Sequence, residues 1–480
     1  MGEYFLRDGR IDLGHKAPPM VQGKFYRDSS NPVPILQQRV IAVANALLNN
    51  PFLSSSDLAL ELGLSREQLA DAYVAMQRYP ALLDLMRTHP QVLTSLKIQD
   101  ILFKNPANLA RILQGEETAP LIVEFHTLGP CGNQCRHCYN IRHGYQYDRS
   151  ATLKKEDYLA LIAELTTAGT QSINFSGGLE PLSDRQALPA IERAIQNGLG
   201  VTIFTTGLHL TRKIRPMVIE AERIRISMYG TNADNYLHFA RCRNSNTFNA
   251  IIKNIRETVA LKQKTGSKVS IGICMIVVKD NFRELKAMVE LAYDLGVDTV
   301  VIRAQFGKNI QNFTQDELDE IARMLAQIQA KESQGQYGNL FIDIGESFYF
   351  LSEQNRFHPQ TIISAKPLST CYATRLKIGL DPWGHIFPCA LITQPGVNQG
   401  NLSTFMIGMV KENPAGIISA HQAFLRSYPT GFPISFCRDA GIICNDFEGN
   451  TNAWVAKFSE DLSFGIPLEQ QPFFHLYGAE

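Results

Sequence analysis

Leu121-Ile-Val-Glu-Phe125 is an apolar run typical of a buried strand, and it leads into the loop Cys131-Gly-Asn-Gln-Cys135-Arg-His-Cys138. A Cys-x3-Cys-x2-Cys loop offers three thiolates to a cubane of four irons, so one iron keeps an open position for a small chelating ligand. Zinc is the alternative, but structural zinc sites usually take four ligands from paired short Cys-x2-Cys units. The spacing therefore predicts a catalytic [4Fe-4S] cluster on these three cysteines.

A second motif follows at the end of the next predicted strand, in Gly177-Gly178-Leu179-Glu180-Pro181. Two glycines without side chains allow backbone carbonyls to approach a ligand amine. The carboxylate of Glu180 can accept a hydrogen bond from the same ammonium group. An ordinary strand-ending turn is the alternative, but the motif's place one strand after the cysteine loop favours a ligand site.

Together these motifs resemble the radical S-adenosylmethionine superfamily, with Leu179 inserted in the family's Gly-Gly-Glu-Pro sequence. The resemblance implies that a reduced cluster cleaves S-adenosyl-L-methionine and releases a 5′-deoxyadenosyl radical. It also implies that Gly177, Gly178 and Glu180 position this cofactor. Ser227, in a later strand with period-two alternation, would then lie near the cofactor ribose or carboxylate.

Arg303 ends another predicted strand, Val300-Val-Ile-Arg303. By the same resemblance it is a candidate partner for the methionine carboxylate of the cofactor. A surface salt bridge is the alternative for this arginine.

Six strands alternate with helices between about residues 121 and 333, at 121–126, 171–175, 201–205, 223–228, 270–277 and 298–303. In the helical stretch that includes 282–295, apolar residues recur at spacings of three and four, Asn281 to Glu284 form a capping-box signature, and Gly296 ends the helix. Such alternation predicts an α/β fold, a partial (β/α)6 barrel with parallel strands. Both motifs follow strand ends, where barrel enzymes place their catalytic residues.

The C-terminal third carries a second group of cysteines, Cys371, Cys389, Cys437 and Cys444. The spacing Cys-x12-Gly-x4-Cys resembles the opening of the SPASM and twitch extensions, which hold auxiliary iron–sulfur clusters. Four thiolates suffice for one fully ligated cluster, so the resemblance implies one auxiliary [4Fe-4S] cluster, as in a twitch domain. Buried thiols in a small hydrophobic hairpin are the alternative.

We therefore expect three domains: a helical N-terminal domain at 1–115, the barrel at 116–335 and the auxiliary-cluster extension at 336–480. Lysine plus arginine balances aspartate plus glutamate at 46 each, which gives no electrostatic argument for nucleic acid or an anionic membrane. The apolar runs are too short for a membrane helix, and no secretion signal is evident. We expect a cytoplasmic enzyme with neither nucleic acid nor membrane as a partner.

Two substrate classes remain open. The favoured hypothesis is a ribosomally made precursor peptide, because the separate helical domain offers a docking surface; peptide epimerases that convert L- to D-residues resemble this layout. The alternative is a small-molecule dehydrogenase or dehydratase acting on an aminocyclitol or sugar. Either enzyme needs an external one-electron donor, such as flavodoxin or ferredoxin. A non-enzymatic electron carrier is disfavoured by the open iron and the Gly-Gly turn.

Epimerisation requires a thiol that returns a hydrogen atom to the substrate radical. Cys242 and Cys274 are the cysteines left over from both predicted clusters. Cys274 shares a strand face with Ser270 and Gly272, whereas Cys242 follows the fourth barrel strand on a loop. Each is a candidate hydrogen donor, and ordinary packing is the alternative for both.

Overall fold

The structure is a computed structural model of the 480-residue chain. It describes residues 5–7, 10–12, 35–49, 53–79, 82–83, 86, 106–116, 118–135, 138, 151–242, 244–304, 313–344, 370–393, 405–410, 416–429, 431–439 and 446–475. No helix in these ranges is long and apolar enough to span a bilayer.

The chain forms two compact units, one made of Met1–Glu116 with Phe447–Glu480 and the other of Glu117–Asp446. Residues 447–480 thus pack with the N-terminal helices, whereas the sequence analysis grouped them with the cysteine-rich extension. This grouping of the C-terminal residues has a physical cause, because the last long helix buries its aromatic side chains within the first unit. The functions expected of the three sequence ranges stay predictions.

The larger unit is built on a ten-stranded sheet in the order β13-β12-β11-β3-β4-β5-β6-β7-β8-β9. Its strands are β3 (Ile122–Thr127), β4 (Ser172–Gly178), β5 (Gly200–Thr205), β6 (Arg223–Ser227), β7 (Ser270–Val277), β8 (Thr299–Ala304), β9 (Phe341–Ile344), β11 (Lys377–Leu380), β12 (His385–Phe387) and β13 (Gly408–Met409). Pairing is parallel from β11 through β3 to β9. The six predicted strands and the α/β partial barrel are confirmed.

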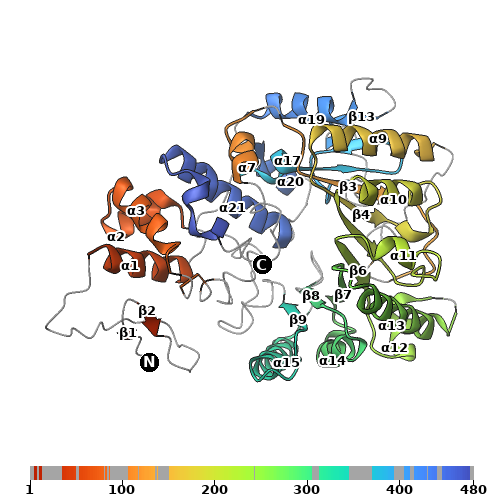
Figure 1. Cartoon of the computed structure of the whole chain (residues 1–480). Helices are drawn as coiled ribbons and strands as arrows, with labels where there is room; N and C mark the ends of the chain where they lie inside the picture. The colour runs from red at the N-terminus through yellow and green to blue at the C-terminus, as the bar shows by residue number, and fades with distance from the viewer. Residues whose placement is uncertain are drawn as a thin grey trace. The chain divides into compact units, whose positions relative to one another are not determined.

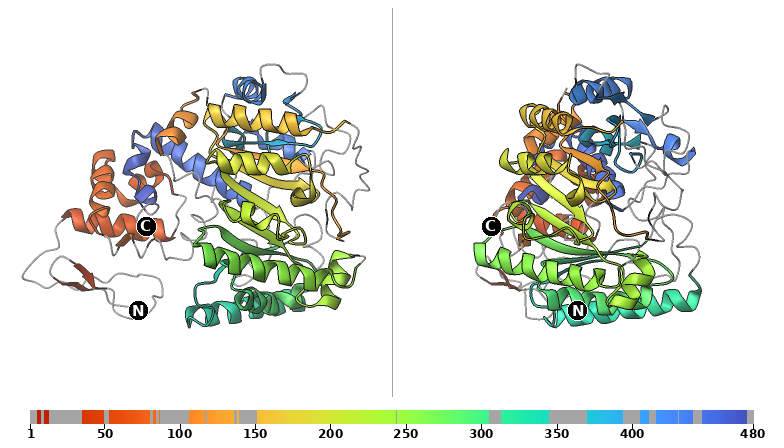
Figure 2. Two further views of the ribbon diagram at one scale, coloured as in Figure 1. Left: turned by 45° about the vertical axis from the view of Figure 1, so that its right-hand side comes forward. Right: turned by 90° about the vertical axis from the view of Figure 1, so that its right-hand side faces the viewer.

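Helices cover the outer side of this curved sheet, as Figures 1 and 2 show. They are α9 (Lys155–Ala168), α10 (Leu188–Gln196), α11 (Arg215–Val218), α12 (Ala233–Ala240), α13 (Thr247–Thr265), α14 (Leu285–Leu295), α15 (Gln315–Ser333) and α19 (Gly416–Ser427). Short helices are η1 (Pro181–Ser183), η2 (Phe282–Glu284), α17 (Ala373–Leu376) and α20 (Ile434–Asp439). A two-stranded sheet pairs β10 (Thr370–Cys371) with β14 (Phe432–Pro433).

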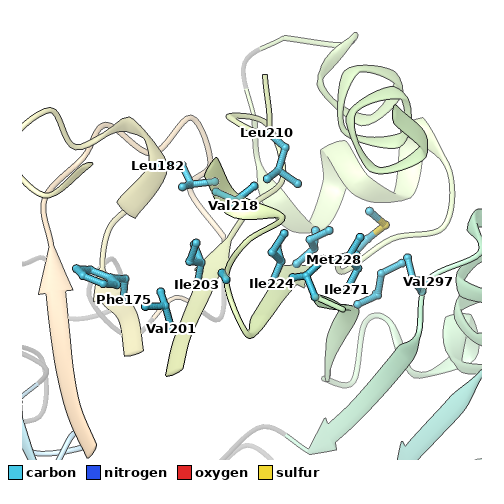
Figure 3. Packing of buried hydrophobic residues seen from close by; sticks show 14 of the residues in the cluster. Phe175, Leu182, Val201, Ile203, Leu210, Val218, Ile224, Met228, Ile271 and Val297 are labelled. Carbon is cyan, nitrogen blue, oxygen red and sulfur yellow. The ribbon is translucent and has the colours of Figure 1, made fainter. Parts of the chain in front are cut away.

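The core of the larger unit lies between the sheet and these helices. Phe175, Ile203, Ile224 and Ile271 are fully buried side chains on successive strands that point toward the helices, and Figure 3 shows this packing. Burial of such apolar area is the main term that stabilises the sheet. The intervening residues of each strand lie on the opposite side, which we call the inner face, because successive side chains alternate.

The sheet is wider than the predicted six strands. β9 adds a seventh parallel barrel strand, and β11 joins the other edge beside β3. The turn at Pro382 and Gly384 connects β11 to β12, with Gly384 at φ 92°. Asp381 stabilises this turn by accepting hydrogen bonds from the backbone N–H groups of Trp383 and His385, both at 2.9 Å.

The smaller unit contains β1 (Phe5–Arg7), β2 (Arg10–Asp12), α1 (Ile35–Asn49), α2 (Ser55–Leu62), α3 (Arg66–Met76), α7 (Pro106–Leu113), α21 (Asp446–Ser463), η5 (Leu468–Gln470) and η6 (Pro472–His475). Gly63 ends α2 in the left-handed conformation, and Ser65 caps α3 through a capping box with Gln68. In the C-terminal segment, Trp454 stacks on Phe458 with ring centroids 5.4 Å apart.

Candidate active site

The cysteine loop follows β3 directly and is held in place by the helix after β6. The side-chain amide of Asn133 donates to the hydroxyl of Tyr236 at 2.9 Å, and the backbone N–H of Gln134 donates to the carbonyl of Ala240 at 2.8 Å. Asn133 is buried, as is the Tyr236 ring on α12. These contacts fix the loop at the C-terminal end of the parallel strands.

Cys131, Cys135 and Cys138 lie near one another in this loop, with Cys135 buried and the other two partly exposed. Burial raises the pKa of the Cys131 thiol to about 11, and the charges of Glu180 and Cys138 add to this effect against a backbone hydrogen bond from Asn133. Burial likewise raises the pKa of Cys135, and the neighbouring Cys131 and Cys138 raise it further. Thiols with such neighbours lose their protons when they bind metal.

The chemistry of the expected cluster sets how its three thiols must be arranged. A cubane distributes its thiolates over different iron atoms, so its ligands need to surround a volume and not to meet at one point. The partial exposure of Cys131 and Cys138 leaves that side of the loop open to such a group.

The Gly-Gly turn at the end of β4 requires glycine at both positions. Gly177 and Gly178 have φ values of 51° and 54°, in the left-handed region. A Cβ on Gly177 would lie 2.3 Å from the His126 ring, and one on Gly178 would lie 2.2 Å from the Thr127 carbonyl oxygen. The turn therefore packs its backbone directly against β3, beside the segment that leads to the cysteine loop.

Glu180 ties the ends of two strands together. One carboxylate oxygen accepts from the hydroxyl of Thr205 at 2.6 Å, and the other accepts from the backbone N–H and the hydroxyl of Thr206, both at 2.7 Å. The residue is 1% exposed. In this conformation the carboxylate acts within the protein, where it orders the Gly-Gly turn relative to β5; its predicted contact with the cofactor amine stays a prediction.

Ser227 and Cys274 are direct partners on the neighbouring strands β6 and β7, so their side chains share the inner face. Tyr229 lies close to both, and its hydroxyl hydrogen-bonds Ser227. Burial raises the pKa of Tyr229, and the nearby thiols Cys135 and Cys274 raise it further. The tyrosine therefore stands between the cysteine loop and the inner face.

The two leftover cysteines differ in their surroundings. The Cys274 thiol is 7% exposed on the inner face and accepts a hydrogen bond from Nη2 of Arg225 at 3.2 Å. The Cys242 thiol lies in the loop after α12, near Cys135, with its sulfur 3.8 Å from the carbonyl oxygen of Asn244. Of the two, Cys274 belongs to the sheet surface beside Ser227, and Cys242 belongs to the surroundings of the cysteine loop.

Arg303 forms a two-pronged ion pair with Asp343 on the inner face, at 3.0 and 2.6 Å. Both side chains are nearly buried, at 12% and 11% exposure. The pair therefore links β8 to β9 and differs from the exposed salt bridge that the sequence analysis weighed. A contact between Arg303 and the cofactor carboxylate stays a prediction.

The inner face also carries a polar network on β3. The Glu124 carboxylate lies 3.4 Å from Nε2 of His126 and accepts a hydrogen bond from Ser176 at 2.5 Å. Burial opposes ionisation, but the hydrogen bond from His126 and the charge of Lys377 outweigh it and lower the pKa of Glu124 to about 2. The carboxylate is therefore a stable anion whose charge is already compensated.

Three of the four cysteines of the second group lie in one cluster. Cys371, Cys389 and Cys437 belong to one hydrophobic cluster with Phe387 and Phe432, whereas Cys444 lies outside the described residues. Burial raises the pKa of Cys437 to about 12, and the nearby Cys371 thiol contributes. Three thiols from β10, from the residues after β12 and from α20 thus share one aromatic environment, and the auxiliary cluster stays a prediction.

Several residues of the site were missed by the sequence analysis. Asn133, Tyr236 and Tyr229 hold or flank the cysteine loop, and His126 defines the space for the Gly-Gly turn. The period-two alternation in β6 placed polar residues on one face, but only the three-dimensional register shows which residues of neighbouring strands meet.

Comparison with known proteins is consistent with this arrangement. Residues 128–292 match the Radical SAM superfamily. The chain is 24% identical over 315 residues to dTDP-4-amino-4,6-dideoxy-D-glucose ammonia-lyase of Streptomyces venezuelae; the match covers 62% of this chain and 63% of the lyase. It therefore spans less than two thirds of that relative's length.

Two solved structures are similar at low sequence identity. Streptococcus suis SuiB bound to the precursor peptide SuiA matches with a TM-score of 0.50 and 14% identity, covering 71% of this chain and 73% of SuiB. Native anSMEcpe with bound AdoMet matches with a TM-score of 0.47 and 11% identity, covering 72% of this chain and 97% of that protein. The SuiB likeness shows a shared fold.

Proposed function

We propose that this chain, whose residues 128–292 match the Radical SAM superfamily, uses a 5′-deoxyadenosyl radical to take a hydrogen atom from a small polar substrate. The observation that carries the proposal is the placement of the three-cysteine loop and the Gly-Gly turn side by side at the ends of β3 and β4. When bound, the reduced cluster supplies the electron that splits S-adenosylmethionine into methionine and the radical.

The protein's own residues position the reactants. Cys131, Cys135 and Cys138 would hold the cluster, and Gly177 and Gly178 would offer backbone groups to the cofactor amine. Glu180 keeps the turn fixed through Thr205 and Thr206, which is a positioning role supported by its short hydrogen bonds. Ser227 on the inner face is our candidate for contact with the cofactor ribose or carboxylate.

The substrate class we favour is an amino sugar carried on a nucleotide. Support comes from the amino-sugar ammonia-lyase, which matches over 315 residues. The inner face also suits a polar ligand, because charged and hydroxyl side chains alternate along β3, β4, β6 and β8. In such a reaction a hydrogen atom would pass from the carbon next to the amine-bearing carbon to the deoxyadenosyl radical, the C–N bond would break to release ammonia, and the external one-electron donor together with a proton would reduce the remaining product radical.

A precursor peptide is the second candidate. The smaller unit is a helical body with its own packing, and such a unit would offer a leader segment a docking surface separate from the barrel. If the reaction is L-to-D epimerisation, Cys274 is the better-placed hydrogen donor, because its thiol lies on the inner face beside Ser227. Cys242 is the weaker candidate.

An auxiliary [4Fe-4S] cluster on Cys371, Cys389, Cys437 and Cys444 completes the proposal. The first three thiols share one aromatic cluster, which supports a common ligand. A protein donor such as flavodoxin or ferredoxin would supply the electron for the catalytic cluster. Iron and sulfide analysis of anaerobically reconstituted protein tests the second cluster, with about eight irons per chain expected for two cubanes and about four for one.

Product analysis separates the substrate classes. Reconstituted enzyme is incubated with S-adenosylmethionine, dithionite and a dTDP-linked amino sugar, and ammonia and 5′-deoxyadenosine are measured. We expect deoxyadenosine to rise above its substrate-free rate and ammonia to appear with it. The amino-sugar proposal fails if the dTDP-sugars leave that rate unchanged while a precursor peptide accelerates it.

A further inference from the structure

Arg225 is a charged side chain on the inner face whose charge has no acidic partner within the described part of the chain. Its guanidinium lies over the Phe204 ring, 5.4 Å from the centroid, and its Nη2 donates to the Cys274 sulfur at 3.2 Å. Its Nε is buried and makes no hydrogen bond. A thiol is a weak acceptor, so the guanidinium has donors to spare.

The acids of the inner face are already engaged elsewhere. The Asp343 carboxylate accepts hydrogen bonds from both terminal nitrogens of Arg303. The negative charge of Glu124 is compensated by His126, Ser176 and Lys377. Arg303 provides the contrast, because it is also an arginine on the inner face but forms a two-pronged ion pair with a carboxylate. Removing a guanidinium from water without such a partner costs free energy, as does leaving a buried N–H unbonded.

The position of Arg225 is next to the reaction site. It precedes Ser227 by one inner-face step on β6, and Gly272 is its direct partner on β7. Gly272 contributes no side chain above the sheet, and a Cβ there would lie 2.1 Å from the Thr299 hydroxyl oxygen. The guanidinium therefore faces the same side of the sheet as Ser227 and Cys274.

We propose that Arg225 binds an anionic group of the substrate, a carboxylate or a phosphate, on the inner face of the sheet. The planar fork of a guanidinium matches the two oxygens of either group, and the ring of Phe204 would hold the fork in place. This inference rests on the proposed function and adds to it the charge that the substrate must carry. Arg225 is a substrate-binding residue in this proposal, and Cys274 then lies within reach of the bound group.

The test measures anion binding by the reconstituted, S-adenosylmethionine-bound full chain. Inorganic phosphate and acetate are titrated separately by calorimetry at constant ionic strength. We expect saturable binding of at least one anion, which Arg225→Gln weakens by tenfold or more and Arg225→Lys weakens less. Arg283→Gln is the matched control, because Arg283 is 63% exposed and paired with Glu320, and it should bind as the wild type does.

Three results overturn the proposal. The first is that neither anion binds the wild type. The second is that Arg225→Gln, with normal iron content and circular dichroism, binds the anion as tightly as the wild type does. The third is that Arg225→Gln weakens the binding of S-adenosylmethionine itself, so that the anion is the cofactor's own carboxylate. Preferential binding of phosphate or of acetate identifies the source of the charge. Deoxyadenosine formation by the wild type is measured alongside, since its absence would reject the proposed function, whereas its presence without Arg225-dependent binding rejects this inference alone.

Discussion

Gly177 shows how much of the site depends on one missing side chain. Its φ of 51° disfavours any residue with a Cβ, and the His126 ring occupies the place where that Cβ would lie. The sequence marked the glycine pair as a candidate cofactor site, but it gave no sign that the His126 ring excludes a side chain at Gly177. The ring comes from the neighbouring strand, and its contact depends on the parallel register of β3 and β4.

Gly177→Ala should lower the free energy of unfolding by about 2 kcal/mol or more, from the left-handed backbone and the contact with His126 together. Gly266→Ala is the control, because Gly266 has φ 70° with nothing within 4 Å of the added Cβ, and it should cost only about 1 kcal/mol. Denaturant unfolding measures both. Equal losses in the two variants would refute the role of His126.

Glu180→Gln should remove the hydrogen bond from the Thr206 backbone N–H, because an amide nitrogen in place of that carboxylate oxygen cannot accept it. We expect a loss of stability of about 1–3 kcal/mol and weaker S-adenosylmethionine binding. Glu67→Gln, on an exposed side chain of α3, is the control for the charge change. Wild-type stability and cofactor affinity in Glu180→Gln would show that the carboxylate does not position the turn.

Among the secondary-structure elements, α19 carries a histidine whose protonation opposes folding. His421 is fully buried and bonds the Thr374 carbonyl oxygen at 2.9 Å. Burial lowers the pKa of His421 to about 4, against the effect of that hydrogen bond. The unfolded chain therefore binds a proton below its ordinary pKa of 6.5 that the folded chain excludes, so stability falls as the pH falls from 6.5 toward 4.

His421→Gln should reduce this acid sensitivity. Between about pH 7 and about pH 5 the wild type should lose about 1–2 kcal/mol that the variant does not lose. His238→Gln, on an exposed side chain of α12, should behave as the wild type. Thermal melts at the two pH values test this, and identical acid sensitivity in wild type and His421→Gln would contradict the burial argument.

Strands and helices of the barrel were predictable because their apolar periodicity is strong. The end of α14 at Gly296 was correct, yet the capping box at its start was wrong. The Asn281 side chain accepts from the Val278 N–H at 2.7 Å, and the Glu284 carboxylate accepts from Asn235 at 2.7 Å. Asn281 thus caps a turn that precedes it, and Glu284 binds a partner 49 residues away that only the fold brings near.

The strands outside the six-fold repeat were harder to predict for a similar reason. β9 and β11 are four residues each, and their parallel partners β8 and β3 lie far away in the sequence. Likewise, the alternation that marked Ser227 did not show that Arg303 already had Asp343 as its partner. Site residues whose contacts depend on pairing between strands far apart in the sequence could therefore not be predicted from the local pattern.

At the scale of the whole molecule, the C-terminal segment completes the smaller unit. The Lys457 ammonium and the Asp461 carboxylate form an ion pair at 2.7 Å with no exposure of either side chain. Asp461 also accepts from the Ser55 backbone N–H at 2.5 Å, which ties α21 to α2. Deletion of residues 1–116 alone would therefore expose the buried side of α21. Loss of activity in that variant would not show that the N-terminal helices dock a substrate.

Asp461→Asn should destabilise the smaller unit by about 3–5 kcal/mol, because it leaves the buried Lys457 charge without its partner. The exposed pair of Arg66 and Glu67 supplies the control, since Glu67→Gln should leave the stability of the unit nearly unchanged. Hydrogen exchange of α2 and α21 measures the effect within the unit. Unchanged protection in Asp461→Asn would contradict the account of this core.

The account of the whole enzyme depends on cofactor cleavage by the three-cysteine loop. The most direct measurement is 5′-deoxyadenosine formation from S-adenosylmethionine by anaerobically reconstituted protein with dithionite. The wild type should form deoxyadenosine, and the variant with Cys131, Cys135 and Cys138 all changed to alanine should form none while it keeps its circular dichroism. Deoxyadenosine at the wild-type rate from the triple variant, or none from a wild type that holds its full iron, would contradict the central claim.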